Sequence, residues 1–325
     1  MTASLPLEVQ KVFDSFVTTE FTTVDSRGRP ICWPLTPYYE QGDPCIDVTT
    51  ALGYPKKAND ARANPKVSLL FSDPTGSGMD DAAQVLVQGT ADVDARDLEA
   101  NRQRYTREAL VKLPGSKDMQ PPKPLQRLFS FYFTRLYIHV RPERVYVWPG
   151  GDPTREPTLF DARMEEVRSG HDEEPPAPHA AAAGAPPVWD ERMDERMDEL
   201  GARYPNGVLS LVAPDGFPFS VRVPISVDPS SRRIRLGGDV LGVPVQPGLA
   251  CFTVHDHAPD FSWQRNFQIR GDLVEEDGGW VLVPQRMVGG LELPPVSKLQ
   301  LYRMNAGKMV RFWSTAKKTR RELSA

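Results

Sequence analysis

Short stretches of alternating apolar and polar residues, separated by turn signals, run along most of this chain. Residues 84–89 (QVLVQG) and 233–236 (RIRL) show the alternation clearly. In an extended chain it places every second side chain on one face of a strand. The 32 prolines and 24 glycines add frequent turns. The pattern predicts a mainly β protein with peripheral helices, whose strands form closed or Greek-key barrels that hide their edges.

Two segments carry the helical period instead. Their apolar residues recur at intervals of three and four, which puts them on one face of a helix. We expect each helix to cover the end of a barrel. The apolar positions are Val9, Val12, Phe13 and Phe16 in the first segment, and Met193, Met197 and Leu200 in the second.

An internal repeat organises the chain. Residues 21–35 and 209–225 each predict a strand, a glycine-containing turn and a second strand. Aligning Gly28 with Gly216 gives an offset of 188 residues (216 minus 28). Such self-similarity indicates that one supersecondary unit occurs twice.

The offset changes once along the repeat. Pro65 aligns with Pro247, an offset of 182, so the second copy lacks six residues, all between positions 50 and 65. Further matches near the end predict strands at residues 301–302 and 310–313, as counterparts of the last strand of the first copy. We therefore expect two tandem barrels that differ mainly in one segment.

The composition divides the chain into three parts. Residues 1–150 form the first predicted barrel domain, and residues 189–325 form the second. Between them, residues 151–188 are rich in proline and alanine, with clustered acidic residues near the middle, and cannot build a core, so they read as a linker.

Bulk charge and hydropathy narrow the possible partners. The net charge is −4 and the pI about 5.8, which argues against a nucleic-acid-binding protein. No stretch approaches the roughly 20 apolar residues that span a bilayer, and the N-terminus lacks the layout of a signal peptide. Three cysteines without metal-ligand spacing fit a reducing compartment. We expect a cytoplasmic protein without membrane or nucleic-acid partners.

The segment missing from the second copy carries the candidate chemistry. Thr49 and Thr50 end a predicted strand, and Pro55 suits the first position of a helix. Lys56 and Lys57 then fall in the first helical turn, where cations are disfavoured but free backbone N–H groups attract an anion. Hydroxyls, amides and lysines together indicate a phosphate site. The alternative is that both lysines are solvated surface residues.

Residues 28–74 (GRPICWPL to LLFSDP), followed by residues 83–93 (AQVLVQGTADV), resemble the pyridoxamine 5′-phosphate oxidase-like split-barrel flavoproteins, which include FMN-binding members and deazaflavin-binding relatives. The resemblance covers residues 21–93, and more weakly 135–148. It implies a strand lining the flavin ring, a phosphate-binding basic pair and a glutamine beside the ring. The implied cofactor-binding residues are Cys32, Trp33, Pro34, Leu35, Thr49, Thr50, Lys56, Lys57 and Gln84.

The chain departs from the family oxidase at two places. Residues 31–35 contain no basic residue, and Arg144 is not followed by the expected histidine. Oxidation of pyridoxamine phosphate is therefore not expected, and the substrate stays open. The resemblance implies an oxidoreductase that transfers hydride between FMN, or a deazaflavin, and a small molecule, with no obligatory protein acid or base. The alternative is a non-catalytic protein that binds or sequesters a flavin or haem.

The second copy has lost both lysines, so we expect it to be structural. Barrels of the resembled family pair about a two-fold axis, which implies that the second domain serves as a built-in partner. The chain would then be an internal pseudo-dimer with one cofactor site, and it could also form a homodimer.

Three further features of the sequence, a histidine pair, a cysteine and a tryptophan, each allow two interpretations. His255 and His257, with Asp260, could bind a metal, but an extended strand turns Asp256 away, and we expect a surface or interdomain loop with no metal. Cys32 is either redox-active beside a flavin or a small buried hydrophobe. Trp33 either stacks near the ring or fills the barrel.

Overall fold

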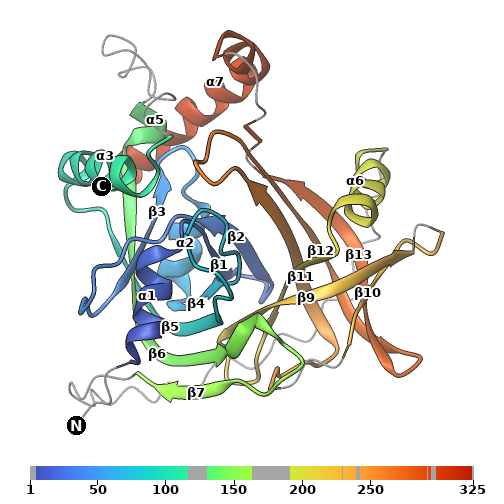
Figure 1. Ribbon diagram of the computed structural model, residues 1–325. Helices are drawn as coiled ribbons and strands as arrows, with labels where there is room; N and C mark the ends of the chain where they lie inside the picture. Colours follow the sequence, from blue (N-terminus) through green and yellow to red (C-terminus); the bar gives the residue numbers. More distant parts are fainter. Residues whose placement is uncertain are drawn as a thin grey trace.

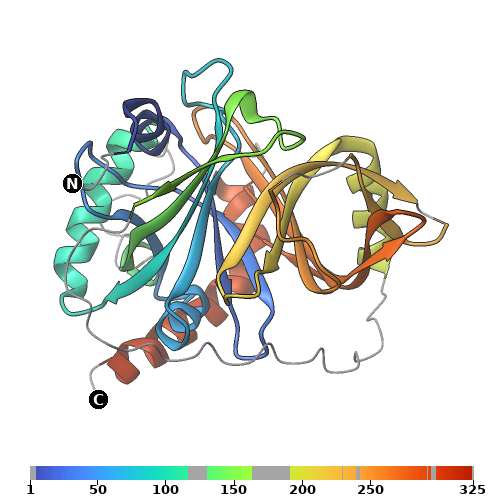
Figure 2. The same ribbon diagram turned by 90° about the horizontal axis from the view of Figure 1, so that it is seen from below.

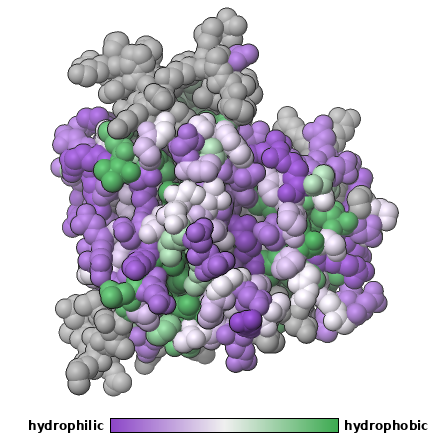
Figure 3. Space-filling model, in the orientation of Figure 1, coloured by the Kyte–Doolittle hydropathy of each residue, from purple (hydrophilic) through white to green (hydrophobic). Residues whose placement is uncertain are grey.

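The computed structural model describes residues 5–115, 130–162, 191–228, 230–238, 242–290, 292–293 and 298–323. The protein is mainly β and consists of two antiparallel sheets with helices at their margins (Figure 1). The face in Figure 3 mixes hydrophilic residues with smaller hydrophobic areas. No helix of the described residues is long and apolar enough to cross a membrane.

The first sheet has the strand order β2-β1-β4-β5-β6-β3, and β7 pairs with the C-terminal part of β6. An isolated bridge between Tyr38 and Asp47 links the segment after β2 to β3 and brings the two ends of the sheet together. The strands are β1 (Thr19–Val24), β2 (Pro30–Leu35), β3 (Ile46–Ala51), β4 (Lys66–Phe71), β5 (Gln84–Asp94), β6 (Arg135–Trp148) and β7 (Thr158–Asp161).

The second sheet closes completely into a barrel of order β10-β13-β12-β11-β8-β9. Figure 2 looks along this barrel and shows it beside the first sheet. Its strand order repeats that of the first sheet, with β8 in the place of β1 and β13 in the place of β6. The strands are β8 (Asn206–Val212), β9 (Pro218–Asp228), β10 (Arg233–Leu236), β11 (Gly248–His257), β12 (Gln264–Glu276) and β13 (Gly279–Gly289).

The hairpin that opens each sheet has the same hydrogen bonds in both copies. Asp25 N–H donates to Arg29 O and Gly28 N–H to Asp25 O, while Gly216 N–H donates to Ala213 O. Gly28 and Gly216 have φ values of 73° and 82°, which disfavour residues with a side chain. The glycine turns at the offset of 188 residues are therefore a structural requirement of both hairpins.

A second shared feature is a β-bulge in the long hairpin. The β5–β6 register shifts at Gly89, and the β12–β13 register shifts at Gly271. A Cβ at either glycine would lie 2.1 Å from a backbone carbonyl oxygen of the facing strand, that of Arg141 or Val283. No side chain fits there, so both glycines are needed for close backbone approach.

The helices surround the two sheets. Both helices predicted from their apolar period are present, and their apolar residues are buried, with Phe13 packing against Phe71. The helices are α1 (Leu7–Ser15), α2 (Lys56–Ala63), α3 (Leu98–Lys112), α5 (Ser130–Phe133), α6 (Glu191–Arg203) and α7 (Lys298–Leu323), and a 3-10 turn, η2, spans Pro149–Gly151.

The strands predicted at residues 301–302 and 310–313 are wrong, because both segments lie in the 26-residue helix α7. Met309, Phe312 and Ala316 recur at helical spacing and pack into the core of the first domain. The apolar residues of this segment match those of β6 in type but recur at the spacing of a helix. The strand that occupies the place of β6 is β13, and its Pro284 faces Gly271 as Pro142 faces Gly89.

The predicted linker is only partly described. Its first residues continue the first domain, since β7 pairs with β6 over four residues, including Val145 with Phe160. The remainder of the proline- and alanine-rich segment, residues 163–190, lies outside the described residues.

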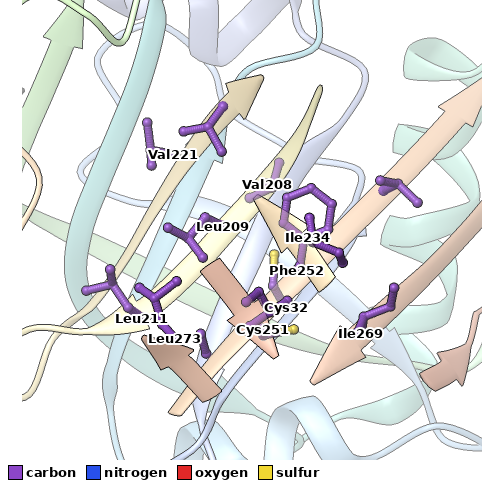
Figure 4. Close-up of a cluster of buried hydrophobic side chains, with 14 of the residues drawn as sticks. Cys32, Val208, Leu209, Leu211, Val221, Ile234, Cys251, Phe252, Ile269 and Leu273 are labelled. Carbon is purple, nitrogen blue, oxygen red and sulfur yellow. The ribbon is translucent and has the colours of Figure 1, made fainter. Parts of the chain in front are cut away.

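Buried polar contacts join the two domains along β1 and β2. Thr22 Oγ1 lies 2.9 Å from Ser220 Oγ, and Gln268 Nε2 donates to Cys32 O at 2.7 Å. Figure 4 shows Cys32 beside Cys251 within the apolar cluster of the second barrel. The same cluster contains Leu70, Leu86 and Trp148 of the first sheet, so the interdomain contact is packed like an interior.

Candidate functional site

The loop between β3 and α2 is held by its own backbone and by one threonine. Thr50 Oγ1 donates to Tyr54 O at 2.7 Å, and Tyr54 N–H donates to Ala51 O. Pro55 has helical φ and ψ, and its carbonyl accepts the first helical hydrogen bond, from Asn59. Asn64 then adopts an extended conformation before Pro65, which ends α2. The short helix predicted here is confirmed.

The two lysines of the first turn have different environments. Lys56 is 54% exposed, and its Nζ lies 2.7 Å from Asp60 Oδ2 one turn along the helix. Lys57 is half-buried, and its Nζ lies 5.9 Å from the centre of the Trp33 ring. The ammonium group of Lys57 forms no hydrogen bond or ion pair with another described residue. Lys56 is thus neutralised locally, while Lys57 is available to an anion.

Burial and, to a lesser extent, the nearby positive charge of Arg135 lower the pKa of Lys57 from 10.5 to about 8, although the charge of Asp60 raises it. A second cation beside a partly desolvated lysine is unfavourable without a negative partner. An anion bound between the two would remove this repulsion.

Arg135, at the start of β6, is 7% exposed, and sequence reasoning missed it. Its Nη2 donates to Tyr105 Oη at 2.6 Å, and its guanidinium packs 4.0 Å and 4.3 Å from the ring centres of Tyr105 and Tyr132. Its Nε is buried and has no hydrogen-bond partner within the described part of the chain. A buried cation with a free donor and no carboxylate partner among these residues is a feature typical of an anion-binding site.

The two threonines of β3 point to opposite faces of the sheet. Thr49 lies opposite Tyr137, two residues from the Ala51–Arg135 pair, and so shares the face of Arg135. Thr50 lies on the other face and donates its hydroxyl to the loop. The structure therefore places Thr49 on the side of the cations, and Thr50 stabilises the loop that presents Lys57.

The residues of β2 that were predicted to line the flavin ring have different environments. Cys32 is fully buried at the interdomain contact, and burial raises the pKa of its thiol to about 12, which favours its role as a small hydrophobe. Trp33 lies under Lys57, while Leu35 packs against the core of the first domain. Pro34 is half-buried opposite Glu20. Trp33 is thus the residue of this strand that contacts the candidate anion site.

Gln84 lies at the boundary between the two domains. It is 3% exposed, and its Oε1 accepts a hydrogen bond of 2.9 Å from the backbone N–H of Arg222 in the second domain. Its Nε2 has no hydrogen-bond partner among the described residues. The side-chain carbonyl of Gln84 therefore forms a hydrogen bond between the two domains.

The C-terminal helix covers the loop that presents the lysines. The Phe312 ring of α7 lies 4.1 Å from the Tyr54 ring, centre to centre, and 6.3 Å from that of Phe131. A Cβ at Gly53 would lie 3.2 Å from both phenylalanine side chains. Figure 1 shows α7 beside α5, next to the first sheet. The last element of the second half of the chain thus completes the wall of the candidate site in the first.

The equivalent loop of the second copy lines a groove of about 490 Å³ between the domains. Gly242, Val243 and Pro244 form one side, and Arg144 and Tyr146 of β6 belong to the other. None of the described residues that line this groove is a lysine, and Arg144 is paired with Asp215 at 2.6 Å. The groove therefore lacks the free cations of the first copy.

Comparison with known proteins finds no matching family model and no matching curated protein. Solved structures similar to part of the chain include a FAD-binding protein from Mesorhizobium loti, at 22% identity over 45% of this chain and 94% of that one, with a TM-score of 0.31. An F420 reductase matches at 17% identity over 42% of this chain and 94% of that one, with a TM-score of 0.32.

A protein from Clostridium acetobutylicum related to general stress protein 26, of the pyridoxinephosphate oxidase family, matches at 14% identity over 48% of this chain and 92% of that one, with a TM-score of 0.34. Each of these structures spans less than half of this chain. Similarity at this level does not assign a function.

Proposed function

We propose that this protein binds the phosphate end of a flavin-type nucleotide, FMN or a deazaflavin, and is an oxidoreductase acting on a small molecule. The observation that carries the proposal is that Lys57 and Arg135 lie close enough to repel each other, while neither has an ion pair with a carboxylate among the described residues. A phosphate brings up to two negative charges and three acceptor oxygens, which match a lysine ammonium and a guanidinium.

The donors available for a phosphate come from three elements. Arg135 offers its free Nε, Lys57 its ammonium, and Thr49 a hydroxyl on the same face of the sheet. Trp33 adds an aromatic surface beside Lys57. A bound flavin would supply hydride transfer, so the protein need only orient it and exclude water. Lys56 and Thr50, with internal partners, would support the site without contacting the phosphate.

The second domain fits the role of a built-in partner. It contributes α7 over the lysine loop and a buried contact along β1 and β2, while its own loop lacks lysine. These features favour an internal pseudo-dimer with one cofactor site per chain.

Binding of FMN and of riboflavin, which lacks the phosphate, tests the proposal. Quenching of flavin fluorescence should show that wild-type protein prefers FMN, and that Lys57→Gln weakens FMN binding by about tenfold to a hundredfold, corresponding to about 1.5–3 kcal/mol for a charged hydrogen bond. Riboflavin binding should not change. Lys56→Gln is the matched control and should keep FMN affinity within about twofold. Equal loss in both variants would contradict the assignment.

The absorption spectrum of the purified protein distinguishes the cofactor classes. A flavin has two visible bands, a deazaflavin one band at shorter wavelength, and haem a Soret peak. Reduction of the bound flavin by a reduced nicotinamide nucleotide or a reduced deazaflavin would indicate an enzyme. A cofactor that binds but is not reduced would favour the sequestering protein.

A further inference from the structure

Two histidines of the second domain and one aspartate of the first form a cluster at the domain boundary, apart from the lysine site. His255 and His257 lie on one face of β11, with their rings 6.3 Å apart and nearly parallel. Asp73 follows β4 in the first domain. The side chains of both histidines are 2% exposed, and that of Asp73 is 16% exposed. The segment expected to be a loop is therefore a buried strand.

We propose that Asp73, His255 and His257 bind a divalent transition-metal ion, such as Zn²⁺, between the two domains. One ligand atom from each residue lies within 4.8 Å of the other two. Asp73 Oδ2 is 3.5 Å from His255 Nδ1 and 3.7 Å from His257 Nε2. Ligands of a tetrahedral zinc ion with bonds of about 2.0–2.1 Å lie roughly 3.3 Å apart, only slightly closer.

The hydrogen bonds of His257 leave the correct nitrogen free. His257 Nδ1 lies 2.9 Å from Ala258 O, and a carbonyl can only accept, so Nδ1 carries the proton. The lone pair of Nε2 then faces Asp73 and the Thr18 hydroxyl, which is 3.3 Å away. Histidine ligands of metals commonly donate their other N–H to a backbone carbonyl in this way.

In His255 too, one ring nitrogen contacts an acceptor, here the Glu20 carboxylate, and the other faces Asp73. Its Nε2 lies 2.6 Å from Glu20 Oε1, and when this nitrogen carries the proton it donates to that carboxylate, which orients the ring. Arg222 Nη2 lies 3.0 Å from the same nitrogen and donates to Glu20 Oε1 at 2.9 Å. His255 Nδ1 is buried and makes no hydrogen bond within the described residues. In a neutral ring, this nitrogen presents a lone pair to the carboxylate of Asp73. Two acceptors facing each other in a buried place need a cation between them.

A hydrogen bond also fixes the orientation of the Asp73 carboxylate. Thr75 N–H donates to its Oδ1 at 3.0 Å, which fixes the group and leaves Oδ2 toward the histidines.

Neither aspartate of the segment around the two histidines is the third ligand. Asp256 points to the other face of β11, where its Oδ2 is 3.6 Å from Arg203 Nη2. Asp260 accepts from the backbone N–H of Ser262 in an exposed turn. The third ligand comes from the other domain, and imidazole with carboxylate suits zinc, iron, cobalt or nickel and not magnesium. Burial of the cluster favours a structural role, in which the metal holds the domains together.

The test uses the full chain without an affinity tag, stripped with a chelator and then titrated calorimetrically with Zn²⁺. We expect one equivalent of Zn²⁺ per chain, with a Kd in the micromolar range or tighter, a rise in Tm on binding, and no response to Mg²⁺. Co²⁺ in place of Zn²⁺ should give the visible absorption of a tetrahedral site. Absence of a stoichiometric Zn²⁺ site in wild-type protein would overturn the proposal.

Variants separate this site from adventitious binding. Asp73→Asn and His257→Gln should each weaken Zn²⁺ binding at least a hundredfold, whereas Asp256→Asn, the matched control on the other face, should bind as wild type does. If a ligand variant fails to fold, the wild-type stoichiometry and the Co²⁺ spectrum still decide. Equal Zn²⁺ affinity in all four proteins would place the metal at another site. FMN binding is measured in parallel, because the two sites do not depend on each other.

Discussion

Thr22 and Ser210 occupy equivalent positions of the two copies, 188 residues apart, and their hydroxyl oxygens lie 3.5 Å from each other across the domain boundary. At a two-fold axis a residue meets its own equivalent. Ser220 completes the cluster, 2.9 Å from Thr22 and 2.8 Å from Ser210. The contact between equivalent positions is the geometric basis for the proposed internal pseudo-dimer.

Replacing Thr22 with valine should remove this contact without changing the shape of the side chain. We expect Thr22→Val to lower the free energy of unfolding by about 1–2 kcal/mol, because it leaves the buried Ser210 and Ser220 hydroxyls with one partner fewer. Ser68→Ala is the control, since the buried Ser68 hydroxyl on the neighbouring strand has no partner among the described residues. Urea unfolding measures both. A larger loss in Ser68→Ala than in Thr22→Val would contradict the role of the cluster.

The pH dependence of FMN binding should report the state of Lys57. Its pKa of about 8 in the free protein lies below the ordinary 10.5, so the ammonium loses its proton as the pH rises through 8. Phosphate carries nearly its full charge by neutral pH, with a second pKa of about 6. The Kd should therefore stay constant from about pH 7 to 8 and then rise by up to about tenfold per pH unit.

Lys57→Gln is the control for this profile. Its FMN affinity should be weak and independent of pH over the same range, because Arg135 keeps its charge. Fluorescence titrations at matched ionic strength provide the measurement. A wild-type profile that is flat to pH 10 would show that Lys57 does not contact the phosphate.

The bulge at Gly89 should not tolerate a side chain. A Cβ there would lie 2.1 Å from Arg141 O, and backbone on a paired strand cannot move aside cheaply. We expect Gly89→Ala to lower the free energy of unfolding by about 2–3 kcal/mol. Gly289→Ala is the control, because nothing lies within 4 Å of its Cβ position and its φ is not positive. Thermal and urea unfolding that rank the two variants equally would argue against the bulge as the cause.

The packing of α7 on the lysine loop can be tested at two adjacent aromatic residues. Phe312 contacts Tyr54 and is half-buried, whereas Trp313 is 53% exposed. Phe312→Ala should destabilise the protein by about 2 kcal/mol, less than for a fully buried phenylalanine, and increase cleavage near the C-terminus in limited proteolysis. Trp313→Ala should stay within about 0.5 kcal/mol of wild type. The reverse ranking would mean that α7 packs through another face.

The strands, the covering helices and the glycine turns follow from the sequence because their causes are local. A two-residue alternation predicts a strand and a repeat of three and four predicts a helix, whichever surface they later meet. The apolar face of α1 and the turn at Gly28 needed no knowledge of the rest of the chain. The segment of α7 was assigned to strands because aligned residue types were given more weight than its helical spacing.

The site residues that sequence reasoning missed depend on distant pairings. In the sequence, Arg135 occupies a polar position of an alternating strand. Only the pairing of β6 with β3 and the packing of Tyr105 bury it near Lys57. Lys56 and Lys57 look alike in the sequence, and their difference comes from Asp60 on one side and Trp33 on the other.

The same limit applies to the histidine pair. Their shared face of β11 follows from strand geometry, but the carboxylate that faces them, Asp73, belongs to the other domain. Local periodicity therefore determined most of the strands and the two covering helices, and the internal repeat identified the lysine segment. The tertiary structure alone decided which charges are buried, which are paired and which face each other, because burial and charge pairing depend on residues brought together from far apart in the chain.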